Sequence, residues 1–310
     1  MQDNLNDIED LLQEVSSPLI RPGLSRMARL MAALEHPERG FQAVHVVGTN
    51  GKGSISAMLE SVFLKAGYRT CLYTSPHLVD VTERIRFGGV PISREMFLYS
   101  VGKVCLAVRA SFDFLERPTY FEVLTAAAFH SIAKYAPDIA IIEAGMGGRL
   151  DATNIMNNVV MSVVASIGMD HSEYLGPDLE TIAMEKFLVL RPGGSSVYSG
   201  GSTALDSCYR SLCEKIFNKG IIASSESRIE DPVIGIDGNS FSLITKKVEL
   251  GRFSTSLGGI VQIENARTAV MSSLILAQRF RKIDLTNLRK GLLNTDWPGR
   301  LEKIIFREKE

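Results

Sequence analysis

The clearest chemistry lies in a glycine-rich segment, Gly48-Thr49-Asn50-Gly51-Lys52-Gly53-Ser54, between an apolar β-type run and an amphipathic helix. In that order, backbone N–H groups converge on anionic oxygens, Lys52 adds a point charge and the Ser54 hydroxyl can ligate Mg²⁺. The match to G-x-x-x-x-G-K-[ST] is imperfect, because Val46 occupies the first glycine position and Gly53 separates the lysine from the serine. A glycine-rich turn without a ligand is the alternative, but the strand-turn-helix context favours a phosphate loop.

Other polar residues follow predicted strands. Glu143 ends the apolar run that begins at Asp138, and a loop with glycines at 145, 147 and 148 comes next. Ser75 follows a predicted strand over 68–73, and His171 follows one over 159–167. Because ligands collect at the carboxyl edge of an open α/β sheet, Glu143 is a magnesium candidate and His171 is the histidine to single out. Ser75 can be a metal-bound hydroxyl or only the start of a Ser-Pro turn.

Three further residues have two interpretations. Glu122 stands three residues after Thr119, the spacing of a capping box, so a structural role is as well supported as a functional one. Asn265 lies near the start of a predicted helix, where a helix N-terminus can face a ligand. Lys186 lies in a predicted helix, and helix statistics alone make such a lysine a solvated one.

The elements that must position these residues form an α/β pattern. We predict a mostly parallel sheet flanked by helices, with a small β subdomain around residues 232–260. The predicted helices are 4–16, 24–35, 93–114, 119–133, 179–188, 203–217, 262–279 and 285–293. The predicted strands are 44–47, 68–73, 138–143, 159–167, 195–198 and 220–223, with β-like pieces at 233–236, 241–245 and 247–250. Residues 81–92 show no clear periodicity and are predicted to be a charged loop.

Composition restricts the class of protein. The 310 residues are 45% hydrophobic and 22% charged with a formal net charge of -1, which indicates a globular chain without a basic field for nucleic acid or an anionic membrane. No apolar run is long enough to span a membrane and the polar N-terminus is not a signal peptide, so we expect a cytoplasmic protein. The four cysteines lack C-x-x-C spacing and are predicted to be buried free thiols. We expect a monomer.

Taken together, eight ordered motifs resemble the folylpolyglutamate synthase/dihydrofolate synthase family of the Mur ligase superfamily, from about residue 24 to residue 302. The motifs are the phosphate loop 48–54, Ser75-Pro76-His77, Tyr120-Phe121-Glu122, the run 143–154, Asp170-His171, Glu185-Lys186, Glu264-Asn265-Ala266 and Trp297-Pro298-Gly299-Arg300. A muramyl ligase is the weaker match, because the run 147–154 resembles the folate branch. The resemblance implies a fold like the central domain of Mur ligases.

The resemblance also implies an ATP-dependent amide ligase with ATP and Mg²⁺ as cofactors. Its catalytic positions match Lys52, Lys186 and His171, and Lys186 matches a lysine that family members carry as a carbamate. Magnesium positions match Ser54, Ser75, Glu143 and His171. ATP positions match Thr49, Asn50, Gly51, Lys52, Gly53, Ser54, Asn265 and Arg300. Positions of the substrate pocket match Ser75, Pro76, His77, Thr119, Tyr120, Phe121, Glu122, Leu150, Asp151 and Ala152.

The implied partners are L-glutamate and either dihydropteroate or tetrahydrofolate (poly)glutamates. The implied reaction passes through an acyl phosphate, which the glutamate amine attacks to form an amide. The segment 187–190 departs from the family, which usually has a small residue and a glycine after the carbamate lysine.

Domain organisation follows from the same resemblance. Residues 1–295 match the ATP- and folate-binding domain, and residues 296–310 match a linker and the start of a C-terminal Rossmann-like domain that carries the glutamate site. We therefore expect a truncated ligase of low activity as an isolated chain. The alternative is a catalytically incomplete remnant that binds ATP or a pterin.

Overall fold

The computed structural model describes residues 3–301 and is built around a sheet of eight strands in the order β4-β3-β2-β5-β1-β6-β7-β8. From β2 to β8 neighbouring strands are parallel, while β3 and β4 form an antiparallel edge. The bounds are β1 Ala43–Val47, β2 Thr70–Tyr73, β3 Ile85–Phe87, β4 Val90–Pro91, β5 Ile139–Glu143, β6 Val159–Val164, β7 Ser195–Tyr198 and β8 Lys219–Ile222. The mostly parallel sheet that the sequence predicts is confirmed.

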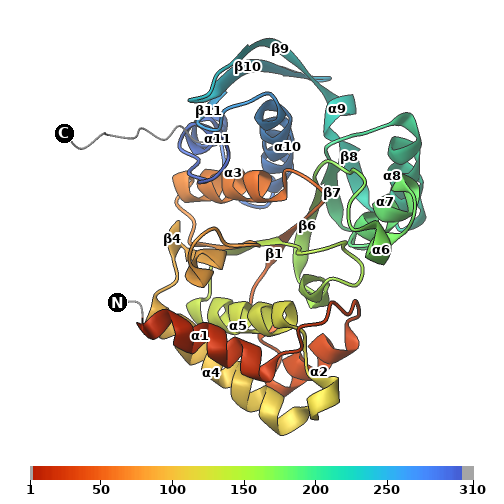
Figure 1. Ribbon diagram of the computed structural model, residues 1–310. Helices are drawn as coiled ribbons and strands as arrows, with labels where there is room; N and C mark the ends of the chain where they lie inside the picture. Colours follow the sequence, from red (N-terminus) through yellow and green to blue (C-terminus); the bar gives the residue numbers. More distant parts are fainter. Residues whose placement is uncertain (1–2, 302–310) are drawn as a thin grey trace, which may run out of the picture.

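Helices cover both faces of the sheet (Figure 1). One face carries α1 Asp3–Val15, α2 Ser25–Ala33, α4 Arg94–Ser111 and α5 Tyr120–Tyr135. The other face carries α3 Lys52–Lys65, α10 Val261–Leu276 and α11 Leu285–Leu293. Helices α7 Leu179–Phe187 and α8 Thr203–Lys215 pack near β7. Short helices are α6 Ser172–Leu175 and α9 Ala223–Glu226, with 3₁₀ turns η1 Pro37–Arg39, η2 Val81–Arg84, η3 Phe114–Glu116 and η4 Ala152–Ile155.

The central strand β1 shows why the sheet is buried on both faces. All five of its residues are buried. Val44 and Val46 join the core under α3 and α10, while Ala43 joins the core on the opposite face under α5. A parallel strand between two helical layers needs a run without polar alternation, and apart from the buried His45 all residues of β1 are apolar.

A second sheet lies outside α10 and α11 (Figure 1). It is antiparallel, in the order β11-β10-β9, with β9 Ser227–Ile234, β10 Asn239–Thr245 and β11 Glu249–Thr255. Phe241 and Phe253 face the helices and join the core around α10. The predicted small β subdomain is confirmed, although its strands begin earlier than expected, at Ser227.

The prediction of a loop over residues 81–92 is wrong. The segment contains η2 and the hairpin of β3 and β4, which turns at Gly88 and Gly89. Strands of two or three residues at a sheet edge are too short to show a periodic pattern, and charged side chains are common on such edges. Likewise, residues 224–228, which lie outside every predicted element, belong to α9 and to the start of β9.

Two other expectations can be compared with the structure. All four cysteines are free, and Cys71, Cys105 and Cys213 are buried as predicted, whereas Cys208 is only partly buried. Over residues 3–301, no helix has the length and apolar content needed to cross a bilayer. The predicted boundary at residue 296 remains a prediction, and residues 302–310 of the predicted linker lie outside the described part of the chain.

Candidate active site

The phosphate-loop segment joins β1 to α3. Gly48 and Gly51 have φ values of 146° and 86°, which side chains with a Cβ rarely adopt. The loop is tied to the end of β6, because the N–H of Thr49 donates to Ser166 O at 2.8 Å and the Thr49 hydroxyl meets the backbone of Gly168 at 3.1 Å. The first N–H groups of α3, at Lys52, Gly53 and Ser54, have no partner within the helix and remain available to an anion.

Two lysines meet at the same carbonyl. Lys52 Nζ donates to Gly48 O at 3.2 Å and to Thr49 O at 3.1 Å, and Lys186 Nζ reaches Gly48 O at 3.1 Å from α7. Lys186 is 2% exposed, and burial, followed by repulsion from Lys52, lowers its pKa to about 8. A solvated lysine is therefore the wrong interpretation of Lys186. The structure brings it beside the phosphate loop, which helix statistics could not indicate.

Glu143 lies at the end of β5, level with Val46 of β1. Burial raises its pKa to about 7, against the opposing effects of Lys52, of the Ser75 N–H and of Arg300. The Ser75 N–H donates to Glu143 Oε2 over 3.3 Å, a long hydrogen bond that leaves the carboxylate with unused acceptor capacity. The site thus places a buried acid among cationic side chains.

Side chains from α10 and from the C-terminal segment contact the loop. A Cβ on Gly51 would lie 2.3 Å from Asn265 Oδ1, and one on Gly53 would lie 3.0 Å from the Trp297 ring. Asn265 is buried and its amide donates to Gln262. Both glycines are therefore required by close packing, and the first turn of α10 lies against the phosphate loop.

A cavity of about 550 Å³ has Ser75, whose N–H contacts Glu143, in its lining. Its walls are residues 17–23, Ser75, Pro76, Arg84, 119–122, 145–152, His171, Tyr174, Leu175 and Glu185. All of the predicted substrate residues except His77 line it, namely Ser75, Pro76, Thr119, Tyr120, Phe121, Glu122, Leu150, Asp151 and Ala152. His77 does not, and its Nδ1 accepts a hydrogen bond of 2.9 Å from Arg84.

Asp151 lines the cavity, but both oxygens of its carboxylate already accept hydrogen bonds from the protein. Its Oδ1 accepts from the Thr153 hydroxyl at 2.5 Å and from the Thr153 N–H at 2.9 Å, and its Oδ2 accepts from the Met146 N–H at 2.9 Å. The geometry therefore gives Asp151 a role in shaping the glycine loop 145–148. Substrate contact by its carboxylate remains a prediction.

His171 lies after β6 with φ 47° and is half exposed, with Nε2 at 3.6 Å from Asp170 Oδ1. Within residues 3–301, no group of three or more His, Cys, Asp or Glu side chains is arranged to hold a metal ion. The predicted magnesium ligands differ from such a group, because Ser54 and Ser75 offer hydroxyls. They remain predictions.

Sequence reasoning missed the segment 17–23. The sequence predicts helices over 4–16 and 24–35 and assigns no role to the connection between them, which forms one wall of the cavity. Pro18, Pro22 and Gly23 indicate a shaped loop in the sequence, but nothing local indicates what it lies against. Arg84 was missed for the same reason, since its segment was predicted to be a charged loop.

Comparison with known proteins gives a consistent result. No protein-family model matches the chain. The chain is 35% identical over 295 residues to the dihydrofolate synthase/folylpolyglutamate synthase of Bacillus subtilis, covering 92% of this chain and 67% of that protein. It is 34% identical over 288 residues to the probable dihydrofolate synthetase of Schizosaccharomyces pombe, covering 91% and 66%. The chain thus spans about two-thirds of the length of these relatives.

A solved structure supports the same likeness. An FPGS–AMPPCP–folate complex superposes with a TM-score of 0.90 at 25% sequence identity, covering 97% of this chain and 74% of that one. That protein holds a non-hydrolysable ATP analogue and a folate together.

Proposed function

Because the chain belongs to the folylpolyglutamate synthase/dihydrofolate synthase family, we propose that it provides the ATP and folate sites of an ATP-dependent amide ligase. The enzyme adds L-glutamate to dihydropteroate, to the terminal glutamate of tetrahydrofolates, or to both. The names of the relatives favour such a ligase over a remnant that only binds ATP or a pterin.

One observation carries the proposal. The cavity that suits a pterin and the loop that suits a triphosphate meet at one sheet edge, where Ser75 lines the cavity and its N–H contacts Glu143 beside the end of β1. A carboxylate at the end of a bound pteroate can therefore approach the γ-phosphate of ATP at this edge. Holding two reactants in this way can contribute on the order of 7–11 kcal/mol to lowering a barrier.

The chemistry follows from that arrangement. A substrate carboxylate oxygen attacks the γ-phosphorus, the bond to the β-phosphate oxygen breaks, and ADP leaves. Lys52 and the N–H groups that open α3 offset the charge on the phosphoryl group. The amine of L-glutamate then attacks the carbonyl carbon of the acyl phosphate, the amine loses a proton, and phosphate leaves as the amide forms.

The donors at the site fit a divalent cation. Glu143 is a buried carboxylate with spare acceptor capacity, and the hydroxyls of Ser54 and Ser75 and the His171 ring complete the proposed ligands. When bound, Mg²⁺ supplies Lewis-acid stabilisation of the transferring phosphoryl group. Lys186, whose pKa is lowered to about 8, has a larger neutral fraction than an ordinary lysine, which is the form that reacts with CO₂ to give a carbamate.

The test is the partial reaction that this chain's own sites should support. Incubation with ATP, Mg²⁺ and dihydropteroate or tetrahydrofolate should release ADP in a carboxylate-dependent manner, and labelled L-glutamate reports amide formation in the same samples. Glu143→Gln should abolish the stimulation, because it removes the carboxyl group that is proposed to hold the cation beside Ser75. If neither ADP nor labelled product depends on the pteroate compound, the proposal is wrong.

A further inference from the structure

One wall of the cavity is the loop over residues 17–23, between α1 and α2. Leu19 and Ile20 at its tip are 62% and 55% exposed. A loop has no ladder of internal hydrogen bonds, so its shape depends on bonds to neighbouring elements. The position of this wall is therefore set by whatever holds the loop.

The loop is tied down along its length. The Ser17 N–H donates to Pro118 O at 2.7 Å, and the Gly23 N–H donates to Leu150 O at 3.4 Å. In the middle, the Arg21 guanidinium donates to Arg117 O at 2.6 Å and to Leu115 O at 3.3 Å. These bonds join the loop to the segment before α5 and to Leu150, which follows the glycine loop 145–148.

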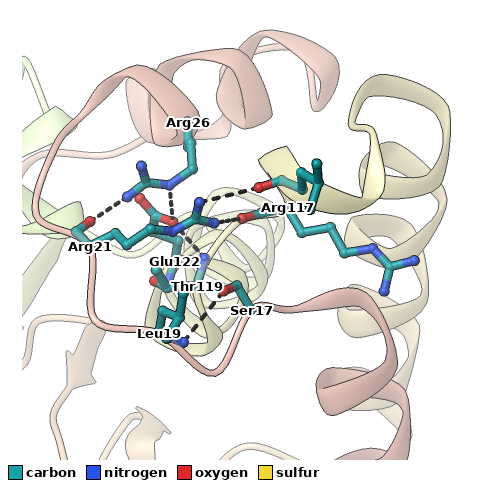
Figure 2. Close-up of polar contacts among 8 residues, drawn as sticks. Ser17, Leu19, Arg21, Arg26, Arg117, Thr119 and Glu122 are labelled. Carbon is teal, nitrogen blue, oxygen red and sulfur yellow. Dashed lines mark hydrogen bonds and ion pairs between the residues drawn. The ribbon is translucent and has the colours of Figure 1, made fainter.

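Arg26, in the first turn of α2, joins three elements through one guanidinium. Its Nε donates to Glu122 Oε2 of α5 at 3.0 Å, and its Nη2 donates to the backbone carbonyl of Arg21 (Figure 2). The two side chains are 14% and 5% exposed. Removing one partner of such a shielded pair leaves the other charge poorly compensated.

Glu122 also orders the start of α5. Its Oε2 accepts from the Thr119 N–H at 2.7 Å, and the Thr119 hydroxyl accepts from the Glu122 N–H at 3.2 Å, which completes the capping box (Figure 2). The residues between them, Tyr120 and Phe121, line the cavity. A single carboxylate thus connects Arg26 to the turn that presents these rings.

We propose that Arg26, which does not line the cavity, is a positioning residue that sets the affinity for the pterin-bearing substrate through Glu122 and the Arg21 carbonyl. It holds the loop 17–23 and the first turn of α5 at a fixed separation across the cavity. This inference rests on the proposed function. It adds a residue that affects binding of the pterin-bearing substrate but not of the nucleotide. The phosphate loop is tied to β6 instead, so nucleotide binding does not depend on Arg26.

Calorimetry on the chain with tetrahydrofolate, in the presence of AMPPCP and Mg²⁺, measures the effect. Arg26→Ala should weaken tetrahydrofolate binding by about tenfold, which corresponds to roughly 1.4 kcal/mol. AMPPCP binding should stay within about twofold of the wild type, because the ties of the phosphate loop are intact. Arg26→Lys keeps the charge but cannot make both bonds in the same geometry, so it should recover part of the lost affinity.

Arg29→Ala is the matched control. Arg29 lies one turn further along α2, where its guanidinium packs 4.7 Å from the centroid of the Phe112 ring, and it does not line the cavity. This variant should bind both ligands like the wild type. Adding Glu122→Ala to Arg26→Ala should cost less than the sum of the two single changes, because both remove the same ion pair.

The possible results distinguish a failure of the proposed role of Arg26 from a failure of the proposed function of the cavity. Equal tetrahydrofolate affinity in the wild type and Arg26→Ala overturns the inference, and so does a parallel loss of tetrahydrofolate and AMPPCP affinity, which indicates a general structural role. A wild-type chain that binds AMPPCP but not tetrahydrofolate or dihydropteroate overturns the proposed function of the cavity itself.

Discussion

At the scale of single residues, burial changes which charges the protein can carry. Burial raises the pKa of Glu143 to about 7 and lowers those of Lys186 to about 8 and His45 to about 3. All three shifts favour the neutral form, as expected when a charged group leaves water. A cation bound at the phosphate loop would favour the ionised form of Glu143, and a bound triphosphate would favour the protonated form of Lys186.

Lys52 gives the first residue-scale prediction. Lys52→Ala should weaken Mg-ATP binding strongly, by at least tenfold, because the ammonium group that neutralises phosphate charge is lost, a change of about 1.4 kcal/mol or more. Isothermal titration of the isolated chain measures it. Lys65→Ala, at the exposed C-terminal end of the same helix, is the control and should leave affinity unchanged. Equal affinity of Lys52→Ala and wild type would remove the phosphate-loop assignment.

At the scale of elements, a buried chain of hydrogen bonds connects β1 to the cavity wall. His45 Nε2 lies 2.8 Å from the Thr153 hydroxyl, which donates to Asp151. With its pKa lowered to about 3, chiefly by burial, His45 is neutral, and its Nε2–H is the donor to Thr153. The strand that leads into the phosphate loop and the carboxylate that shapes the glycine loop therefore share one network.

Thr153→Val tests that network. The change removes the hydroxyl from a fully buried side chain with little change in volume, so His45 and Asp151 each lose a partner, at a cost of about 1–3 kcal/mol in unfolding free energy. Thr153→Ser keeps the hydroxyl and should cost about 1 kcal/mol for the lost methyl group. Urea denaturation compares the two, and a valine variant as stable as the serine variant would contradict the network.

Glu60 of α3 provides a pH-dependent prediction away from the active site. It is 2% exposed beside Arg86 of β3, and burial raises its pKa from 4.5 to about 7 despite that guanidinium. Between these two values the native state binds more protons than the unfolded state, so the contribution of Glu60 to stability falls as the pH rises. Above about 7 the contribution is constant.

Glu60→Gln should therefore gain stability relative to the wild type as the pH rises from 4.5 to about 7. The relative gain is on the order of 3 kcal/mol at most. Denaturation curves at several pH values measure the difference. Glu249→Gln, at an exposed position on β11, is the matched control. A difference for Glu60→Gln that is flat over this pH range would mean that the carboxyl is ionised normally.

At the scale of the whole molecule, the phosphate-loop helix is held between the sheet and α11. A Cβ on Gly291 of α11 would lie 2.6 Å from Val62 Cα and 2.8 Å from Val62 N of α3. Two helix backbones can approach this closely only where a side chain is absent. The small antiparallel sheet then packs on the outer side of α11, so the layers depend on this contact.

Gly291→Ala should destabilise the fold by about 1–3 kcal/mol, because the backbones of α11 and α3 must separate. Gly102→Ala in α4 is the matched control, since a Cβ there meets nothing within 4 Å. In that helix the change should be neutral or stabilising by up to about 1 kcal/mol. Thermal unfolding compares the stabilities of the two variants. Equal stabilities would show that α11 does not pack closely against α3.

Much of the architecture could be predicted from local pattern. The runs 43–47 and 139–143 are apolar except for His45 and Glu143, because a parallel strand is buried on both faces, and that signature needs no knowledge of distant residues. The phosphate loop follows from its glycines, lysine and flanking elements. The capping box of Thr119 and Glu122 is also local, and the structure contains it.

Tertiary structure decided what depends on distant partners. Lys186 is buried against Gly48 O, 138 positions away, and Arg26 meets Glu122, 96 positions away, so neither role leaves a mark in the neighbouring sequence. The edge hairpin of β3 and β4 is stabilised by pairing with β2, because two- and three-residue strands have no pattern of their own. The sequence by itself determined which strands are buried and where the phosphate loop lies, since both depend on residues adjacent in the chain. Only the folded chain decided which loops enclose the cavity and which charges face each other, because those contacts form between segments that the sheet brings together.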